Sequence, residues 1–139
     1  MDEAARTALA LTPASTARER TVDITTIGRR SGLPRRLEIW IYRVGDKNYL
    51  TGTPGRTQDW YRNIVDNPRL TVHLKNGTTA DLPATGIPIT DDDDERRRVF
   101  TSVVADLSQP GNPGRLTQPV TVDDFMAGSI LVELEFDES

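Results

Sequence analysis

The sequence predicts a small, mainly β (α+β) protein, a barrel of six or seven strands with two or three short helices. Three observations lead to this fold class. Short segments of alternating apolar and polar residues recur along the chain, as in strands with one buried face. Tight turns such as Gly45-Asp46 and Asn76-Gly77 join several of these segments, and such turns favour hairpins. Only two stretches of the main body follow a helical period, so a doubly wound parallel sheet is not expected.

The first two strands are predicted on either side of a basic turn. Residues 21–27 alternate β-branched residues with others, and residues 36–43 alternate three aliphatic residues with Glu38, Trp40 and Tyr42. The second pattern indicates a strand with two nonpolar faces, as in a barrel wall that meets another subunit. The remaining predicted strands are residues 47–51, 70–74, 78–89 and 129–136.

Two helices are predicted between these strands. In residues 58–66 Trp60 and Ile64 are four residues apart, and we expect Thr57 or Asp59 near the N-cap. The second helix follows Thr90, the expected N-cap, and carries an acidic run in its first turn, where the helix dipole favours carboxylates. We therefore interpret this run as a helix start and not as a metal site. Its expected buried stripe is Val99, Phe100, Val103, Val104 and Leu107, and residues 108–119 are expected to form a loop.

The length of 139 residues allows one domain. We divide it into an N-terminal arm or short helix at residues 1–20 and a barrel at residues 21–139. The chain has no cysteine, which removes disulfides, thiolate nucleophiles and sulfur ligands for metals. Its single histidine, His73, falls in a strand pattern. No metal site and no catalytic residue is therefore predicted.

The location of the protein is also an expectation from the sequence. No apolar stretch is long enough to span a membrane, and the N-terminus lacks the pattern of a signal peptide. We expect a cytoplasmic protein without a transmembrane segment, and peripheral contact with a membrane stays open. The apolar share of 36% is low for the length, which indicates either unordered ends or a core completed by a second subunit.

The net charge of −4 is divided unevenly along the chain. Residues 1–75 contain thirteen Lys and Arg against eight Asp and Glu, whereas residues 76–139 contain four against thirteen. A local basic patch on an acidic protein favours a small anionic ligand, because most of the surface would repel a nucleic acid. A nucleic-acid partner is therefore not expected.

The turn between the first two predicted strands is a candidate anion site. Residues 28–36 hold four arginines, two glycines and a serine, without an acidic residue. Guanidinium groups bind phosphate or carboxylate in a bidentate way, and turn amides add further donors. A turn that is merely solvated is the alternative. The candidate ligands in this turn are Arg29, Arg30, Ser31, Gly32 and Arg35.

A second turn, residues 51–57, leads into the helix of residues 58–66. If the sheet curls, both turns and the N-terminus of this helix can meet at one ligand. None of these residues is a plausible nucleophile or proton-transfer group, so chemistry at this site would come from a bound cofactor. The candidate binding residues here are Thr53, Gly55, Arg56, Trp60 and Asn63.

Three motifs occur in order along the chain: Thr-Thr-x-Gly-Arg-Arg-Ser-Gly-x-Pro-Arg at residues 25–35, Gly-x-Pro-Gly at 52–55, and Asp-Trp-Tyr-x-Asn-Ile-x-x-Asn-Pro at 59–68. Together they resemble the deazaflavin (F420)-dependent nitroreductase family, a branch of the split β-barrel flavin and deazaflavin oxidoreductases. The resemblance extends from about residue 21 to the end of the chain. It implies a split β-barrel, a homodimer and F420 bound in a groove, where a hydride moves between its C5 atom and a substrate.

The resemblance also implies roles for residues. The first motif, with Arg29, Arg30, Ser31 and Arg35, matches positions that hold the phosphate and acidic tail of F420. Gly55 and the start of the helix that carries Trp60 and Asn63 match positions that approach the deazaflavin. The expected function is F420-dependent reduction of a small apolar substrate, such as a quinone, an enone or a nitro compound.

The chain departs from the family's pattern before Trp60. The segment there is shorter than in most family reductases and has no lysine, and Arg56 is its only cation. The tyrosines that shape the nitroimidazole pocket of the best-known members are absent, which disfavours nitro reduction. The alternative function is a non-catalytic binder that holds F420, FMN, haem or a lipid-like acidic ligand in the same groove.

Overall fold

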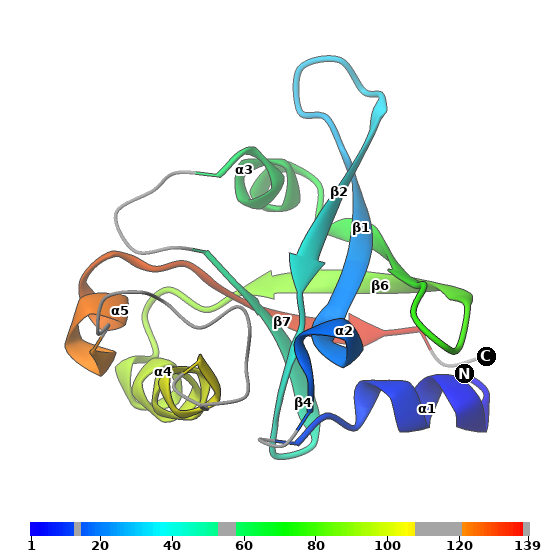
Figure 1. Cartoon of the computed structure of the whole chain (residues 1–139). Helices are drawn as coiled ribbons and strands as arrows, with labels where there is room; N and C mark the ends of the chain where they lie inside the picture. The colour runs from blue at the N-terminus through cyan, green and yellow to red at the C-terminus, as the bar shows by residue number, and fades with distance from the viewer. Residues whose placement is uncertain (13–14, 53–57, 108–120, 138–139) are drawn as a thin grey trace.

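The structure, a computed structural model, describes residues 1–12, 15–52, 58–107 and 121–137. Seven antiparallel strands form one sheet in the order β2-β1-β5-β6-β7-β4-β3 (Figure 1), which confirms the predicted fold class. The strands are β1 (Thr21–Ile27), β2 (Pro34–Trp40), β3 (Tyr42–Val44), β4 (Lys47–Thr51), β5 (Arg69–Leu74), β6 (Ala80–Pro88) and β7 (Leu131–Phe136). The helices are α1 (Glu3–Leu9), α2 (Ala17–Arg20), α3 (Asp59–Asp66), α4 (Asp93–Leu107) and α5 (Val122–Gly128).

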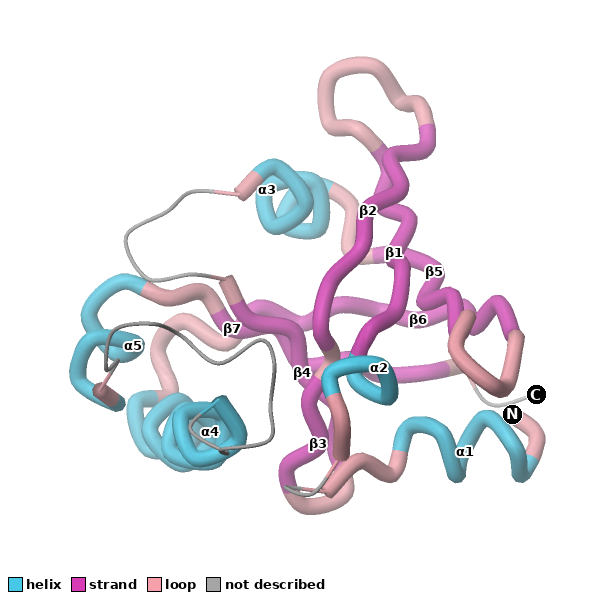
Figure 2. The backbone as a smooth tube through the Cα atoms, viewed as in Figure 1, coloured by secondary structure: helices cyan, strands magenta, loops and turns pink. Residues whose placement is uncertain are grey.

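The sheet curls because its two edge strands are consecutive in the chain. β2 pairs with β1, and β3 pairs with β4 at the other end of the strand order. Only Ile41 separates β2 from β3, so the two edges of the sheet must come together there (Figure 2). The backbone N–H of Ile41 donates to the carbonyl of Arg20 at 2.9 Å instead of to a strand partner. The prediction of one strand over residues 36–43 was therefore wrong: the change of pairing partner divides it in two.

The described residues contain five helices, more than the two or three that were predicted. The additional ones are short: α2 has four residues, and α1 and α5 have seven each. Side-chain caps support all three, since Asp2, Thr16 and Thr121 each accept a hydrogen bond from a first-turn amide. None of these helices is long and apolar enough to cross a bilayer, and the same holds for α3 and α4.

The predicted N-cap of α4 was wrong, whereas α3 begins at Asp59, beside its N-cap as expected. At α4, Asp92 and not Thr90 accepts from a first-turn amide, with 3.0 Å between its Oδ1 atom and the N atom of Glu95. At α3 the N-cap is Gln58, and it makes no side-chain capping bond. Thr57, the other expected cap, lies outside the described residues, as does the loop predicted at residues 108–119.

Two apolar clusters form the core. The larger one joins the inner face of the sheet to α1 and α3, and includes Leu9, Ile24, Trp60 and Val72. The smaller one joins α4 and α5 to β3, β4 and β7 around Phe100. Within the predicted stripe of α4, Val99, Phe100 and Val103 are buried, whereas Val104 and Leu107 are only partly buried.

A close approach between α3 and β6 places α3 beside the β1–β2 hairpin. A Cβ atom on Gly86 of β6 would lie 2.9 Å from Cγ2 of Ile64, so the absence of a side chain there lets α3 pack directly on the strand. The amide of Gly86 also donates to the carbonyl of Pro68 at 2.8 Å, just beyond the end of the helix. The start of α3 is thereby held near the turn that carries the arginines (Figure 1).

Candidate cofactor-binding site

The β1–β2 turn projects from the body of the molecule (Figure 1). Two backbone hydrogen bonds close it: Gly28 N to Leu33 O and Gly32 N to Gly28 O, each at 2.8 Å. Gly32 has a φ of 71°, a conformation that residues with a side chain rarely adopt. The serine and arginines between these glycines are consequently held in a compact loop.

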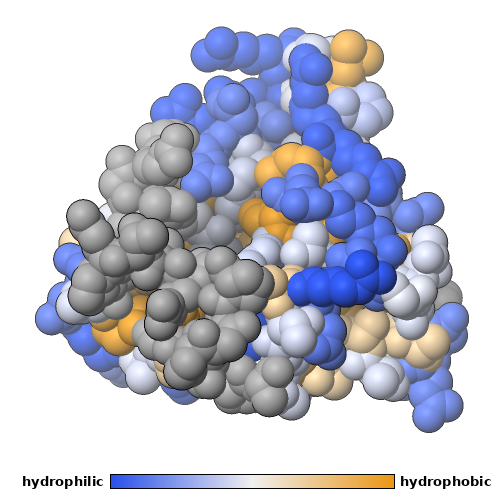
Figure 3. All heavy atoms as spheres, viewed as in Figure 1, coloured by the Kyte–Doolittle hydropathy of each residue, from blue (hydrophilic) through white to orange (hydrophobic). Residues whose placement is uncertain are grey.

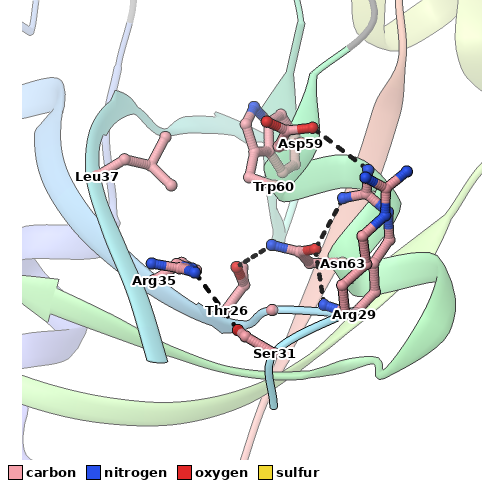
Figure 4. Close-up of a pocket in the computed structure, with 10 residues that line it drawn as sticks. Thr26, Arg29, Ser31, Arg35, Leu37, Asp59, Trp60 and Asn63 are labelled. Carbon is pink, nitrogen blue, oxygen red and sulfur yellow. Dashed lines mark hydrogen bonds and ion pairs between the residues drawn. The ribbon is translucent and has the colours of Figure 1, made fainter. Parts of the chain in front are cut away.

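A pocket of about 370 Å³ lies between this turn, β2 and α3 (Figure 4). It is lined by Thr26, Gly28, Arg29, Arg30, Ser31, Arg35, Leu37, Asp59, Trp60 and Asn63. Figure 4 shows Leu37 and Arg35 on one side of the pocket, with Asp59 and Arg29 across from them. The pocket thus combines cationic, neutral polar and apolar groups from β1, the turn, β2 and α3.

Two of the lining arginines are available to an anion. Arg30 and Arg35 are exposed, and in the described part of the chain neither is paired with a carboxylate. Arg35 donates only to the Oγ atom of Ser31, with 3.4 Å between Nη2 and Oγ. The hydrogen bonds of the turn engage the amides of Gly28, Arg29, Gly32 and Leu33 but not those of Arg30 and Ser31. Two guanidinium groups and two neighbouring amides can therefore donate to one anion.

Arg29 is held by the protein itself. Its backbone N–H and its Nη1 atom both donate to Oδ1 of Asn63, at 3.2 and 3.1 Å, and its Nη2 atom lies 3.4 Å from Oδ1 of Asp59. Asn63 is buried and in turn donates from Nδ2 to Oγ1 of Thr26 at 3.1 Å. This network joins the end of β1, the turn and α3 at one point (Figure 4).

Trp60 and Leu37 supply the apolar part of the pocket. The Trp60 indole is 4% exposed, and its Nε1 atom donates to Oε1 of Gln58 at 2.7 Å, which fixes the ring plane. Tyr61 packs edge-on against it, with 6.2 Å between the ring centroids. Figure 3 shows apolar surface on this face of the molecule, bordered by strongly hydrophilic residues. A ligand with a flat apolar part and an anionic part matches this division.

Six of the predicted site residues come together around the pocket. Gly32 belongs to the turn but does not line the pocket, and Thr53, Gly55 and Arg56 lie outside the described residues. The six lining residues are Arg29, Arg30, Ser31, Arg35, Trp60 and Asn63.

Four further lining residues, Thr26, Gly28, Leu37 and Asp59, were not among the predicted site residues, although Gly28 belongs to the predicted turn. The sequence carried a signal for Thr26, because it is a polar residue on the same strand face as Val22 and Ile24. In the structure it is completely buried. Leu37 and Asp59 carry no comparable signal, since each fits its strand or helix pattern.

The single histidine lies away from this pocket. His73 occupies a position in β5, as its sequence pattern indicates. Its Nε2 atom is 2.7 Å from Oγ1 of Thr25 and its Nδ1 atom is 2.7 Å from Oδ1 of Asp81. Across the described ranges, no group of three or more His, Asp or Glu side chains is arranged to hold a metal ion.

Comparison with solved structures identifies relatives of the fold. A conserved hypothetical protein from Mycobacterium tuberculosis is 21% identical, with a TM-score of 0.63 over 99% of this chain and 82% of that one. An F420-H2-dependent reductase, FDR-A, is 16% identical, with a TM-score of 0.58 over 87% of this chain and 96% of that one. A chain described as a domain-swapped dimer is 17% identical, with a TM-score of 0.51 over 84% and 80% of the two chains.

Comparison at the level of sequence identifies the family. No curated protein sequence matches the chain. The model of the F420H(2)-dependent quinone reductase family matches residues 12–122, a range that includes all three motifs and the whole pocket. The resemblance to deazaflavin-dependent oxidoreductases is thereby confirmed, and the chain belongs to the F420H(2)-dependent quinone reductase family.

Proposed function

We propose that the protein is an F420-dependent oxidoreductase that holds the cofactor in the pocket between the β1–β2 turn and α3. The observation that carries the proposal is that one pocket contains both an apolar wall and two arginines, Arg30 and Arg35, that form no ion pair with a carboxylate of the described residues. Its substrate is a small apolar acceptor: a quinone in the first place, given the family, and otherwise an enone or a nitro compound.

The residues of the pocket fit the chemistry of F420. The phosphate and carboxylates of its tail need donors that carry positive charge, and Arg30, Arg35 and the amide of Ser31 offer them. Its deazaflavin ring needs an apolar contact, which the partly buried Leu37 offers, and the almost completely buried Trp60 also lines the pocket. The arginines of the pocket could also bind the phosphate of FMN. We propose F420 because the chain belongs to an F420H(2)-dependent family.

The chain's own contribution is binding and orientation. When bound, F420H2 supplies a hydride from its C5 atom to the acceptor. Arg30 and Arg35 anchor the tail, and the apolar wall that Leu37 and Trp60 line holds the ring. Fixing the ring relative to the acceptor lowers the entropic part of the barrier, while the apolar wall limits the access of water to the reacting atoms.

We also propose that the protein acts as a homodimer. A similar structure is described as a domain-swapped dimer, and the described surface exposes two large apolar side chains, Leu33 at 57% and Val65 at 60%. They lie on the β1–β2 turn and on α3, the two elements that flank the pocket. Their burial by a second subunit would remove this apolar surface from water.

Titration with oxidised F420, followed by its fluorescence, tests the proposal. We expect saturable binding, and no binding at roughly 50 μM cofactor would overturn it. A parallel titration with FMN tests the choice of cofactor. In a second step, oxidation of F420H2 by a soluble quinone is compared with and without protein. Binding of F420 with no acceleration of this reaction would identify the protein as a non-catalytic binder.

A further inference from the structure

We propose that Asn63 and Arg29 are positioning residues, which brace the β1–β2 turn so that Arg30, Ser31 and Arg35 can hold the anionic tail. The inference rests on the proposed function and separates two groups of residues in the pocket. One group would contact the cofactor, whereas the other would act only through the turn.

The amide side chain of Asn63 makes three hydrogen bonds inside the protein. Its Oδ1 atom accepts two hydrogen bonds from Arg29, and its Nδ2 atom donates to Thr26. The residue is only 4% exposed. Oδ1 has no acceptor position left and only one Nδ2–H remains, on a side chain that is almost completely buried. A ligand that displaced Arg29 or Thr26 would leave a buried group without its partner, which costs free energy.

The position of Asn63 also determines which amides of the turn stay open. Arg29, Arg30 and Ser31 present three successive backbone amides, and the first of them donates to the Oδ1 atom of Asn63. An anion could accept a hydrogen bond from such an amide in the same way. The next two amides, those of Arg30 and Ser31, have no hydrogen-bond partner in the turn. The side chain thus orders the turn while leaving two adjacent donors for a ligand.

Arg29 differs from its neighbours in the same way. Its side chain is 23% exposed and bonded to Asn63 and Asp59, whereas Arg30 is exposed and makes no such contact. The Asp59 carboxylate partly neutralises the charge of Arg29, which lowers its attraction for a further anion. Arg29 and Arg30 are adjacent and have the same side chain, but their surroundings give them different roles: Arg29 braces the turn and Arg30 is left to bind the anion.

A double-mutant cycle on F420 affinity tests this assignment. If Arg29 and Asn63 brace the turn together, the effects of their substitutions should be non-additive, because removing either partner already loosens the turn. We expect Arg29→Ala and Asn63→Ala each to weaken F420 binding about tenfold, and the double variant also about tenfold instead of about a hundredfold. Multiplicative losses for Arg29 with Asn63 would overturn the proposal.

Thermal unfolding provides a second measurement that does not depend on Asn63→Ala folding. The brace predicts that Arg29→Ala lowers the Tm, whereas Arg30→Ala, an equal change of charge one residue further, leaves it unchanged. Equal Tm values would contradict the brace.

Asn63→Asp keeps an acceptor for Arg29, so at high salt, where its added charge is screened, it should restore affinity that Asn63→Ala loses. If the wild-type protein binds no F420, the proposed function is wrong. If it binds F420 and the losses of Arg29→Ala and Asn63→Ala multiply, only the bracing role is wrong.

Discussion

Arg20 and Asp106, 86 residues apart in the chain, form a buried ion pair with 3.0 Å between Nη1 and Oδ2. Their side chains are 1% and 8% exposed. Arg20 also donates to the carbonyls of Thr12 and Ser15, and its guanidinium lies over the ring of Tyr42, 5.8 Å from the centroid. One side chain therefore connects the N-terminal segment, β3 and the end of α4.

Replacing Arg20 by Ala should destabilise the protein strongly, because it removes the opposite charge from a buried carboxylate. We expect a loss of about 3–5 kcal/mol in the free energy of unfolding, measured by urea denaturation. Arg97→Ala serves as a control, since its pair with Asp123 is exposed, and it should cost less than about 1 kcal/mol. Losses of equal size in both variants would contradict this account.

The pH dependence of the Arg20→Ala loss follows from the pKa of Asp106. Burial raises the pKa of Asp106, and the charge of Arg20 opposes the shift. Without Arg20 the folded state should hold the proton more tightly than the unfolded chain does, so stability falls as the pH rises between the ordinary carboxyl pKa and the raised one. The destabilisation should accordingly be smaller at acid pH than at pH 8, which urea titrations at both pH values would show.

Arg35 and Arg36 offer a matched comparison for the proposed anion site. Arg35 lines the pocket, whereas Arg36 donates from Nε to Oδ2 of Asp23 at 2.9 Å and does not line it. Arg35→Ala should weaken F420 binding by about 1.5–3 kcal/mol, the scale of a hydrogen bond to a charged group. Arg36→Ala changes the net charge equally but should alter binding by less than about 1 kcal/mol at physiological salt. Equal losses in fluorescence titrations would indicate that only net charge matters.

Trp60 should report directly on the cofactor. Its indole lines the pocket, so binding of F420 should quench its fluorescence. Trp60→Phe should abolish most of this quenching while Trp40→Phe preserves it, because Trp40 packs against the α4 cluster instead. The loss of the Gln58 bond in Trp60→Phe should cost about 1 kcal/mol of stability. Quenching that disappears only with Trp40 would place the cofactor elsewhere.

Asp23 should make the stability of the sheet depend on acid pH. A hydrogen bond from Lys75, together with the nearby Arg36, holds the pKa of Asp23 below its ordinary value. A lowered carboxyl pKa contributes stability above the ordinary value of 3.8 that is lost as the pH falls through the folded value. Asp23→Asn should therefore lower the Tm by about 2–4 °C at pH 7, and the two melting curves should converge near pH 2. Glu135→Gln, on an exposed position of β7, should change the Tm at neither pH.

Local patterns in the chain were sufficient for much of the fold. The alternation in residues 21–27 and 47–51 predicted β1 and β4 with the observed bounds, and the spacing of Trp60 and Ile64 predicted α3. The arginine-rich turn was also recognisable, because its glycines and cations are adjacent in sequence. Its role as a cofactor anchor stays a prediction, as does the division of the chain after residue 20.

Only the tertiary structure decided the features that depend on distant partners. The break at Ile41 is one, since a strand changes its pairing partner there without any change in its own alternation. The burial of Arg20 is another, because only Asp106 and distant carbonyls make a buried guanidinium tolerable.

The arginines of the turn show the same limit at the site. By itself the sequence determined that Arg29, Arg30 and Arg35 lie close together with two glycines, because local chain geometry requires it. The sequence treats Arg29 and Arg30 alike, whereas the fold brings Asn63 and Asp59 to Arg29 alone. Hydrogen bonding and burial depend on neighbours in space, and these neighbours lie about 30 residues further along the chain.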